Sequence, residues 1–243
     1  MCFAAGQDQH RFPNVANAPT LPAIMNASLI LTLTLFCSIC FGQQSPASEL
    51  HAEEGKDLHL FNLKNSSDLF SFRFWSHGQS VDIRILSDSS QLGEVTNFLR
   101  EVSKSYSVER KVSIGEIKPT IHVQKITLSK GDVQKVIDII NRYAIKELPT
   151  DDSIKAWQPV LDGEWFVIEQ KTAGKYFFKY FSNPNSQVEV PEATRFINFY
   201  SDLKKELSLD DMFWKFFSGL KIKCFTRNGE HTVTCFTKSR PRK

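Results

Sequence analysis

The sequence predicts an α+β fold: a mainly antiparallel sheet of roughly six to eight strands with about three helices packed on it. Alternating apolar runs are joined by short turns, which favours antiparallel neighbours. The apolar period changes from that of a strand to that of a helix at Ser129 and again after Pro191. The helical segments fall in separate blocks between strands, so we expect a layer of helices on the sheet.

The first four strands are expected at residues 69–75, 80–86, 93–102 and 120–128. The first two flank a short turn that contains Gly78 and so form a hairpin. Pairing can set their apolar side chains together over a core: Phe70, Phe72, Phe74, Val81, Ile83 and Ile85. Residues 103–119 are interpreted as a long loop or as an extra pair of short strands.

A helix is predicted from Ser129, which forms a capping box with Asp132, to about residue 145. A second hairpin follows, with strands at 164–171 and 175–181 around Ala173-Gly174. A second helix starts at Pro191, and a third starts at Ser208 through a capping box with Asp211. The last two strands, 221–226 and 231–237, flank Asn228-Gly229, a strong hairpin signal.

Cys224 and Cys235 lie on these last two strands and are predicted to form a disulfide. A two-residue turn would place the two cysteines diagonally on one face. A four-residue turn over residues 228–231 would place them directly opposite each other. Either geometry brings the sulfur atoms within bridging reach after small adjustments.

An apolar segment near the start of the chain indicates export. Leu29–Phe41 has 13 residues, which as a helix would span roughly 20 Å, less than the roughly 30 Å of a bilayer core. Cys40 and Gly42 place small residues at the −3 and −1 positions of a cut after Gly42, as signal peptidase requires. The alternative is a membrane anchor from about residue 21 to residue 41.

These observations divide the chain into five parts. Residues 1–24 are interpreted as an upstream extension of the reading frame, because Met25 is a suitable start for a signal peptide at 25–42. Residues 43–56 read as a flexible leader, residues 57–238 as a single α+β domain, and residues 239–243 as a basic tail. The predicted location is therefore the periplasm, the cell envelope or the medium, and the alternative is a single-pass anchored protein.

Several segments resemble uncharacterised exported proteins of Bacteroidota. They are "VLDGEWFVIEQKTAGKYFFKYFSNPNS", "FINFYSDLKKEL", "SFRFWSHGQSVDI" and the signal ending "CFGQQ". The resemblance covers most of residues 68–207. It implies export, and it implies no activity that can be assigned to particular residues.

Composition and motifs narrow the classes of function. The net charge is +3, and no basic stripe interleaved with aromatic residues occurs, so we expect no nucleic-acid partner. The sequence lacks the nucleophile-elbow, zinc-protease, phosphate-loop and dinucleotide motifs. The histidines are scattered without ligand spacing, so we predict neither a metal site nor a cofactor.

Two carboxylates near the second hairpin are the candidates for acid–base catalysis. Asp162 precedes Gly163 in a tight turn, and Glu169 alternates with Trp165 and Val167, opposite Phe178. Burial among aromatic rings would raise the pKa of Glu169, as a general acid requires. The structural alternative, which we favour, is an outward glutamate paired with a lysine at position 171, 175 or 179.

Aromatic residues are the other candidates. The chain has 20 Phe, and Trp214 with Trp165 or Tyr180 could line a groove for a sugar or a peptide. Ordinary core packing is the favoured explanation. The sequence therefore predicts an exported domain that binds or structures an envelope polymer, a peptide or a protein, with a hydrolase as the first alternative. A membrane contact is expected only if the N-terminal segment is retained.

Overall fold

The computed structural model describes residues 53–102, 120–160, 163–172, 174–222, 224–226 and 234–235. Its sheet contains β1 (Phe70–Ser76), β2 (Gln79–Ile85), β3 (Gln91–Glu101), β4 (Thr120–Thr127), β5 (Trp165–Thr172), β6 (Lys175–Ser182), β7 (Cys224–Thr226) and β8 (Thr234–Cys235). Three longer helices pack on it: α3 (Lys130–Arg142), α4 (Pro191–Leu207) and α5 (Leu209–Ser218). The predicted α+β class is confirmed.

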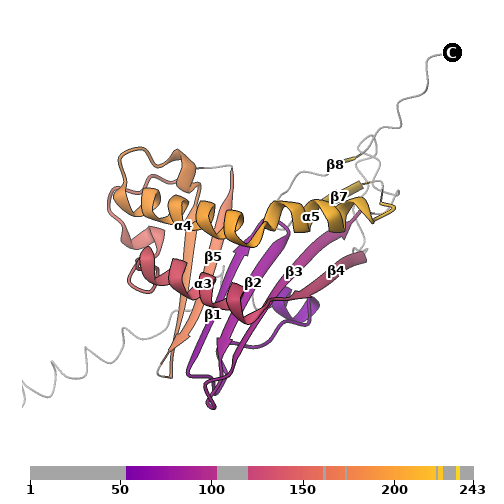
Figure 1. Cartoon of the computed structure of the whole chain (residues 1–243). Coiled ribbons are helices and arrows are strands. Elements are labelled where there is room, and N and C mark those ends of the chain that lie inside the picture. Colours follow the sequence, from indigo (N-terminus) through magenta and orange to yellow (C-terminus); the bar gives the residue numbers. More distant parts are fainter. Residues whose placement is uncertain are drawn as a thin grey trace, which may run out of the picture. The chain divides into compact units, whose positions relative to one another are not determined.

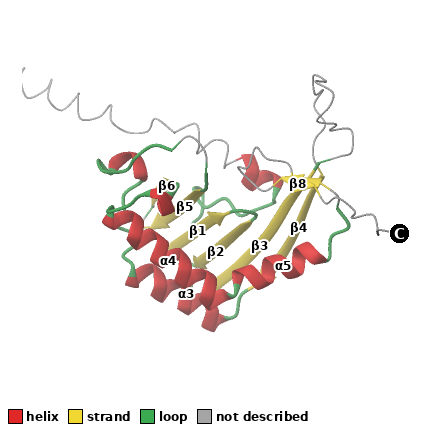
Figure 2. Cartoon of the chain, turned by 90° about the horizontal axis from the view of Figure 1, so that it is seen from above, coloured by secondary structure: helices red, strands yellow, loops and turns green. Residues whose placement is uncertain are grey.

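The strand order is β6-β5-β1-β2-β3-β7-β8, and β4 also pairs with β3. Every pairing is antiparallel. The two hairpins expected from the sequence therefore lie side by side through β1 and β5. Figure 1 shows the curved sheet, and Figure 2 shows α3, α4 and α5 together on one of its faces. We call this the helix face and the opposite one the second face.

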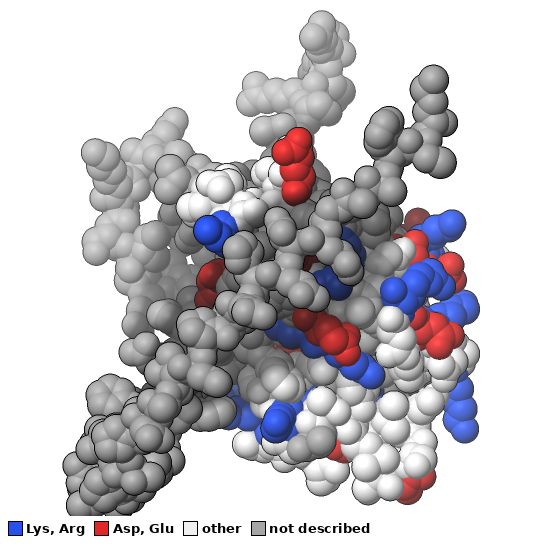
Figure 3. Space-filling model, turned by 90° about the vertical axis from the view of Figure 1, so that its left-hand side faces the viewer, with Lys and Arg blue, Asp and Glu red and all other residues white. Residues whose placement is uncertain are grey.

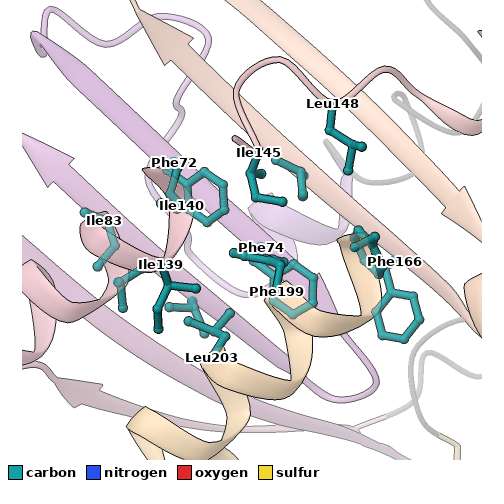
Figure 4. Packing of buried hydrophobic residues seen from close by; sticks show 14 of the residues in the cluster. Phe72, Phe74, Ile83, Ile139, Ile140, Ile145, Leu148, Phe166, Phe199 and Leu203 are labelled. Carbon is teal, nitrogen blue, oxygen red and sulfur yellow. The ribbon is translucent and has the colours of Figure 1, made fainter. Parts of the chain in front are cut away.

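The main core fills the space between the helix face and α3 and α4. The two apolar sets of the first hairpin meet over this core as expected, because Phe70, Phe72 and Phe74 pair with Ile85, Ile83 and Val81. Figure 4 shows these strand side chains meeting residues of both helices. Ten members of this cluster are labelled there: Phe72, Phe74, Ile83, Ile139, Ile140, Ile145, Leu148, Phe166, Phe199 and Leu203.

The helix boundaries show one prediction confirmed and one wrong. At α3 the Ser129 hydroxyl accepts a hydrogen bond from the Asp132 amide at 3.2 Å and donates one to its carboxylate at 2.7 Å, so this helix has the expected cap. The predicted cap at Ser208 is wrong, because its side chain makes no capping hydrogen bond. Its backbone lies in the left-handed region, at φ 51°. The reason is that Ser208 is at once the C-cap of α4 and the N-cap of α5, and its left-handed backbone is the conformation that ends the first of these helices.

The end of α3 is held by a lysine from another element. Lys179 on β6 lies on the helix face, is 7% exposed, and donates through Nζ to the carbonyl oxygens of Ile145 at 2.8 Å and Lys146 at 2.7 Å. Burial lowers the pKa of Lys179 to about 8; Glu147 opposes this shift and Arg195 adds to it. The cation thus satisfies carbonyl groups that follow the helix.

The C-terminal strands carry the predicted disulfide. Cys224 and Cys235 form it from directly opposite positions, with Cα atoms 4.1 Å apart. This is the register expected of the four-residue turn; residues 227–233, which contain the turn, lie outside the described residues. The segment 103–119, whose interpretation the sequence left open, also lies outside them. In the described part of the chain no helix has the length and apolar character that crossing a membrane requires.

Gly93→Ala tests the fit of α3 on the sheet. A Cβ at Gly93 would lie 2.6 Å from Val133 Cγ2 and 3.1 Å from Leu128 Cβ, so we expect a loss of about 1–3 kcal/mol in the free energy of unfolding. Gly131→Ala is the matched control, because it lies in α3 with its nearest atom 3.7 Å away and should stabilise by up to about 1 kcal/mol. Urea denaturation measures both, and equal effects would contradict the packing described.

Lys179 predicts an unusual pH dependence. Its pKa is lower in the folded state than in the unfolded chain, so between these two values only the unfolded state keeps the proton and stability rises with pH. We expect a gain of about 2 kcal/mol between about pH 7 and pH 9.5 that Lys179→Met abolishes. Lys175→Met, on the exposed part of the same strand, should keep the gain. Denaturation curves of the wild type and the two variants at both pH values give the free energies of unfolding. An equal pH dependence in all three proteins would contradict the assigned role of Lys179.

Candidate functional site

Three charged side chains lie in one row across the second face. Arg73 on β1 is directly opposite Asp82 on β2 and Glu169 on β5. Their side chains are 4%, 10% and 12% exposed, so the row is withdrawn from solvent. Charged groups are rarely buried unless they are paired. The geometry of this row therefore decides what Glu169 can do.

Arg73 holds both carboxylates. Its Nε donates to Asp82 Oδ1 at 2.6 Å, and one terminal nitrogen donates to Glu169 Oε1 at 3.5 Å. The other terminal nitrogen donates to the backbone carbonyl of Phe61 at 2.8 Å. A guanidinium stays charged at any ordinary pH, so these acceptors are required to keep it buried.

Glu169 has two further donors. The Trp75 indole Nε1 donates to Oε1 at 2.7 Å, and the Tyr176 hydroxyl donates to Oε2 at 2.7 Å. The expected position opposite Phe178 is confirmed, but the partner is Arg73 and not one of the three lysines. Each of its oxygens thus accepts a short hydrogen bond from within the fold.

The environment shifts the pKa values of the groups around Arg73. Burial raises the pKa of the Asp82 carboxyl, and the attraction of Arg73 opposes this shift. Burial, together with the Glu169 charge, raises the pKa of the Tyr176 hydroxyl far above its usual range. Tyr176 therefore remains a protonated donor to Glu169 and cannot act as a base near neutral pH.

The second face is covered by the segment that precedes β1, residues 53–69, which we call the strap. Residues 53–57, at the boundary between the expected leader and the domain, form a short helix, seen in indigo in Figure 1. The strap places Leu58 in a cluster with Trp75, Phe98 and Val167. Its last part is tied to β2, because Arg84 donates to both oxygens of Asp68 at 2.7 and 3.0 Å. These hydrogen bonds lower the pKa of Asp68.

The structure brings two of the three aromatic candidates together. Trp165 and Tyr180 stack with centroids 6.4 Å apart and planes 21° apart, and both pack against the cluster under the strap. Trp214 is on α5 and 53% exposed; its ring contacts are with Phe213 and Phe217. The two rings that Trp214 contacts belong to a different hydrophobic cluster from the one against which Trp165 and Tyr180 pack. The described contacts do not assemble the three into one groove.

The other candidates add no reactive group. Asp162 lies outside the described residues. Within the described ranges, no group of three or more His, Cys, Asp and Glu side chains is arranged to hold a metal ion. On the side of the molecule seen in Figure 3, the basic and acidic side chains that are described lie interspersed.

Sequence reasoning missed Arg73, Trp75 and Tyr176. One signal was available for the first, because the register that pairs Phe72 with Ile83 also pairs Arg73 with Asp82 on the other face. The contact with Glu169 joins residues 96 positions apart, and no local pattern indicates it. No protein-family model matches the chain, and no curated protein matches it.

Proposed function

We propose that the chain is an exported domain of the periplasm or cell envelope that binds or structures a partner and catalyses no reaction. The observation that carries this proposal is the engagement of Glu169. Both of its oxygens accept hydrogen bonds from buried or half-buried groups of the fold. A general acid or base must reach the proton that it transfers, whereas this carboxylate is committed to stabilising Arg73.

Export is supported by the Cys224–Cys235 disulfide. Disulfides persist in oxidising compartments and are rare in the cytosol. The apolar segment at Leu29–Phe41, the expected cleavage after Gly42 and the resemblance to exported proteins of Bacteroidota support the same proposal. A membrane-tethered accessory protein is the alternative if that segment is retained.

Substitution of Glu169 separates a structural from a catalytic role. Glu169→Ala leaves Arg73 without one of its acceptors and Trp75 and Tyr176 without a shared one, so we expect a loss of about 3–5 kcal/mol in the free energy of unfolding. Glu164→Ala, at an exposed carboxylate, is the matched control and should change stability by less than about 0.5 kcal/mol.

The wild type and a new double variant, Glu169→Gln with Asp162→Ala, are assayed on a panel of hydrolytic substrates. We expect no turnover that depends on either carboxylate. If the wild type shows turnover that is lost in the folded double variant, the proposal of a binding domain is wrong and the protein is a hydrolase.

The exported product tests the location. We expect a mature chain that begins at Gln43 and in which neither Cys224 nor Cys235 reacts with an alkylating reagent until a reductant is added. N-terminal sequencing and mass spectrometry of the intact protein measure both. A mature chain that begins before Leu29 would contradict the cut, and alkylation of both cysteines without reductant would contradict the oxidising compartment.

A further inference from the structure

The strap is held by basic side chains from five different strands. Each strand contributes one: Arg73 from β1, Arg84 from β2, Arg100 from β3, Lys125 from β4 and Lys171 from β5. The sheet thus presents a set of cations to a single extended segment.

Two of these cations bind carboxylates of the strap. Arg84 donates to Asp68 through two nitrogens, and its guanidinium also lies over the Phe61 ring at 3.4 Å. Arg100 is 3.1 Å from Glu54 and 3.6 Å from Asp57. These contacts require acidic residues at defined places along the strap.

The other three cations donate to backbone carbonyl groups. Arg73 binds the carbonyl of Phe61 at 2.8 Å, Lys125 binds that of His59 at 3.1 Å, and Lys171 binds that of Ser66. Any peptide segment offers carbonyl oxygens, so these three contacts do not depend on the strap's side chains.

The strap is not a strand of the sheet. Among the described backbone–backbone hydrogen bonds, one joins it to a strand, from the Leu69 amide to the Ile85 carbonyl. The remaining attachment consists of side-chain donors and of buried apolar groups such as Leu58 and Leu63. Because a single described ladder bond joins the strap to the sheet, the strap can separate from it without breaking the strand pairings beneath, which is how local opening differs from global unfolding.

Removal of the strap would change the charge balance of the second face. Arg73 would keep Asp82 and Glu169, and Lys125 would keep Glu94 at 3.2 Å. Arg84 and Arg100 would lose the carboxylates that bind them, and Lys171 would lose its carbonyl acceptor. The uncovered face would therefore carry three uncompensated cations beside the apolar cluster of Trp75.

We propose that the strap is an autoinhibitory contact, and that the face beneath it binds an extended acidic peptide segment of a partner when the strap lifts. The chemistry of the strap defines that partner: carboxylates for Arg84 and Arg100, and carbonyl groups for the other three cations. This inference rests on the proposed binding function and names the class of its partner.

The probe is a fluorescent peptide with the sequence of residues 53–69, titrated into the mature protein and followed by fluorescence polarisation. The variant Glu54→Gln with Asp68→Asn weakens the strap's hold and leaves the five cations in place. We expect it to bind the peptide at least about tenfold more tightly than the wild type. Asp202→Asn, which breaks the exposed Arg142–Asp202 pair, removes a carboxylate elsewhere and should behave as the wild type.

Hydrogen exchange in the same variants reports whether the strap has opened. We expect faster exchange in residues 53–69 and unchanged protection in α3 and α4; if the double variant does not fold, Asp68→Asn alone takes its place. A strap that exchanges no faster would overturn the proposal, as would an open strap whose face ignores the peptide.

Two further arms test the partner's chemistry. A peptide with Glu54→Gln, Asp57→Asn and Asp68→Asn should bind far more weakly. A polyphosphate of matched charge should gain less affinity in the double variant than the acidic peptide does, because charge alone does not supply the backbone carbonyl groups. An equal gain for polyphosphate would overturn peptide recognition. Loss of this inference leaves the proposed function standing, because that depends on the turnover of the Glu169 variants.

Discussion

The buried guanidinium of Arg73 determines how the polar residues of the second face are arranged. It joins β1 to β2 through Asp82, to β5 through Glu169 and to the strap through the carbonyl of Phe61. Its side chain is 4% exposed. A buried guanidinium is stable only when acceptors surround it, so the fold must supply them. The placement of Trp75 and Tyr176 on Glu169 follows, since an ionised carboxylate with a single partner would be poorly satisfied at that depth.

The two faces of the sheet are shielded from solvent by different elements. The helix face is apolar and is covered by α3 and α4, as expected of an antiparallel sheet with a helical layer. An antiparallel sheet usually leaves its other face to solvent, and the polar residues of β1, β2 and β5 would suit that. The strap covers them instead. The charges are therefore buried in pairs, and the strap is fixed by the same cations that it shields.

The sequence predicted the elements and the pairing within each hairpin, because both depend on local periodicity and turn residues. The meeting of Phe72 and Ile83 over one core is of this kind. So is the Cys224–Cys235 disulfide, although the sequence left open whether the two cysteines lie diagonally or directly opposite each other. The partners of Glu169 were not predictable in this way. The local alternatives were lysines, yet Lys171 and Lys179 donate to carbonyl groups of the strap and of the segment after α3, and the carboxylate goes to a strand 96 residues away. The cap predicted at Ser208 was wrong for a different reason. This residue is also the C-cap of the preceding helix, and its backbone takes the left-handed conformation of that cap.

The division of labour among the five strap-binding cations has a consequence for selectivity. Contacts to carbonyl groups position an extended chain but do not distinguish one sequence from another. Arg73, Lys125 and Lys171 therefore contribute affinity but no sequence selectivity. Sequence selectivity comes from Arg84 and Arg100, because both need carboxylates and would be desolvated and unpaired beneath a neutral segment. The strap satisfies both through Asp68 and Glu54, near its two ends. A competing segment must therefore match the separation of these two arginines, and a face built in this way distinguishes segments by the spacing of their acidic residues more than by their apolar content.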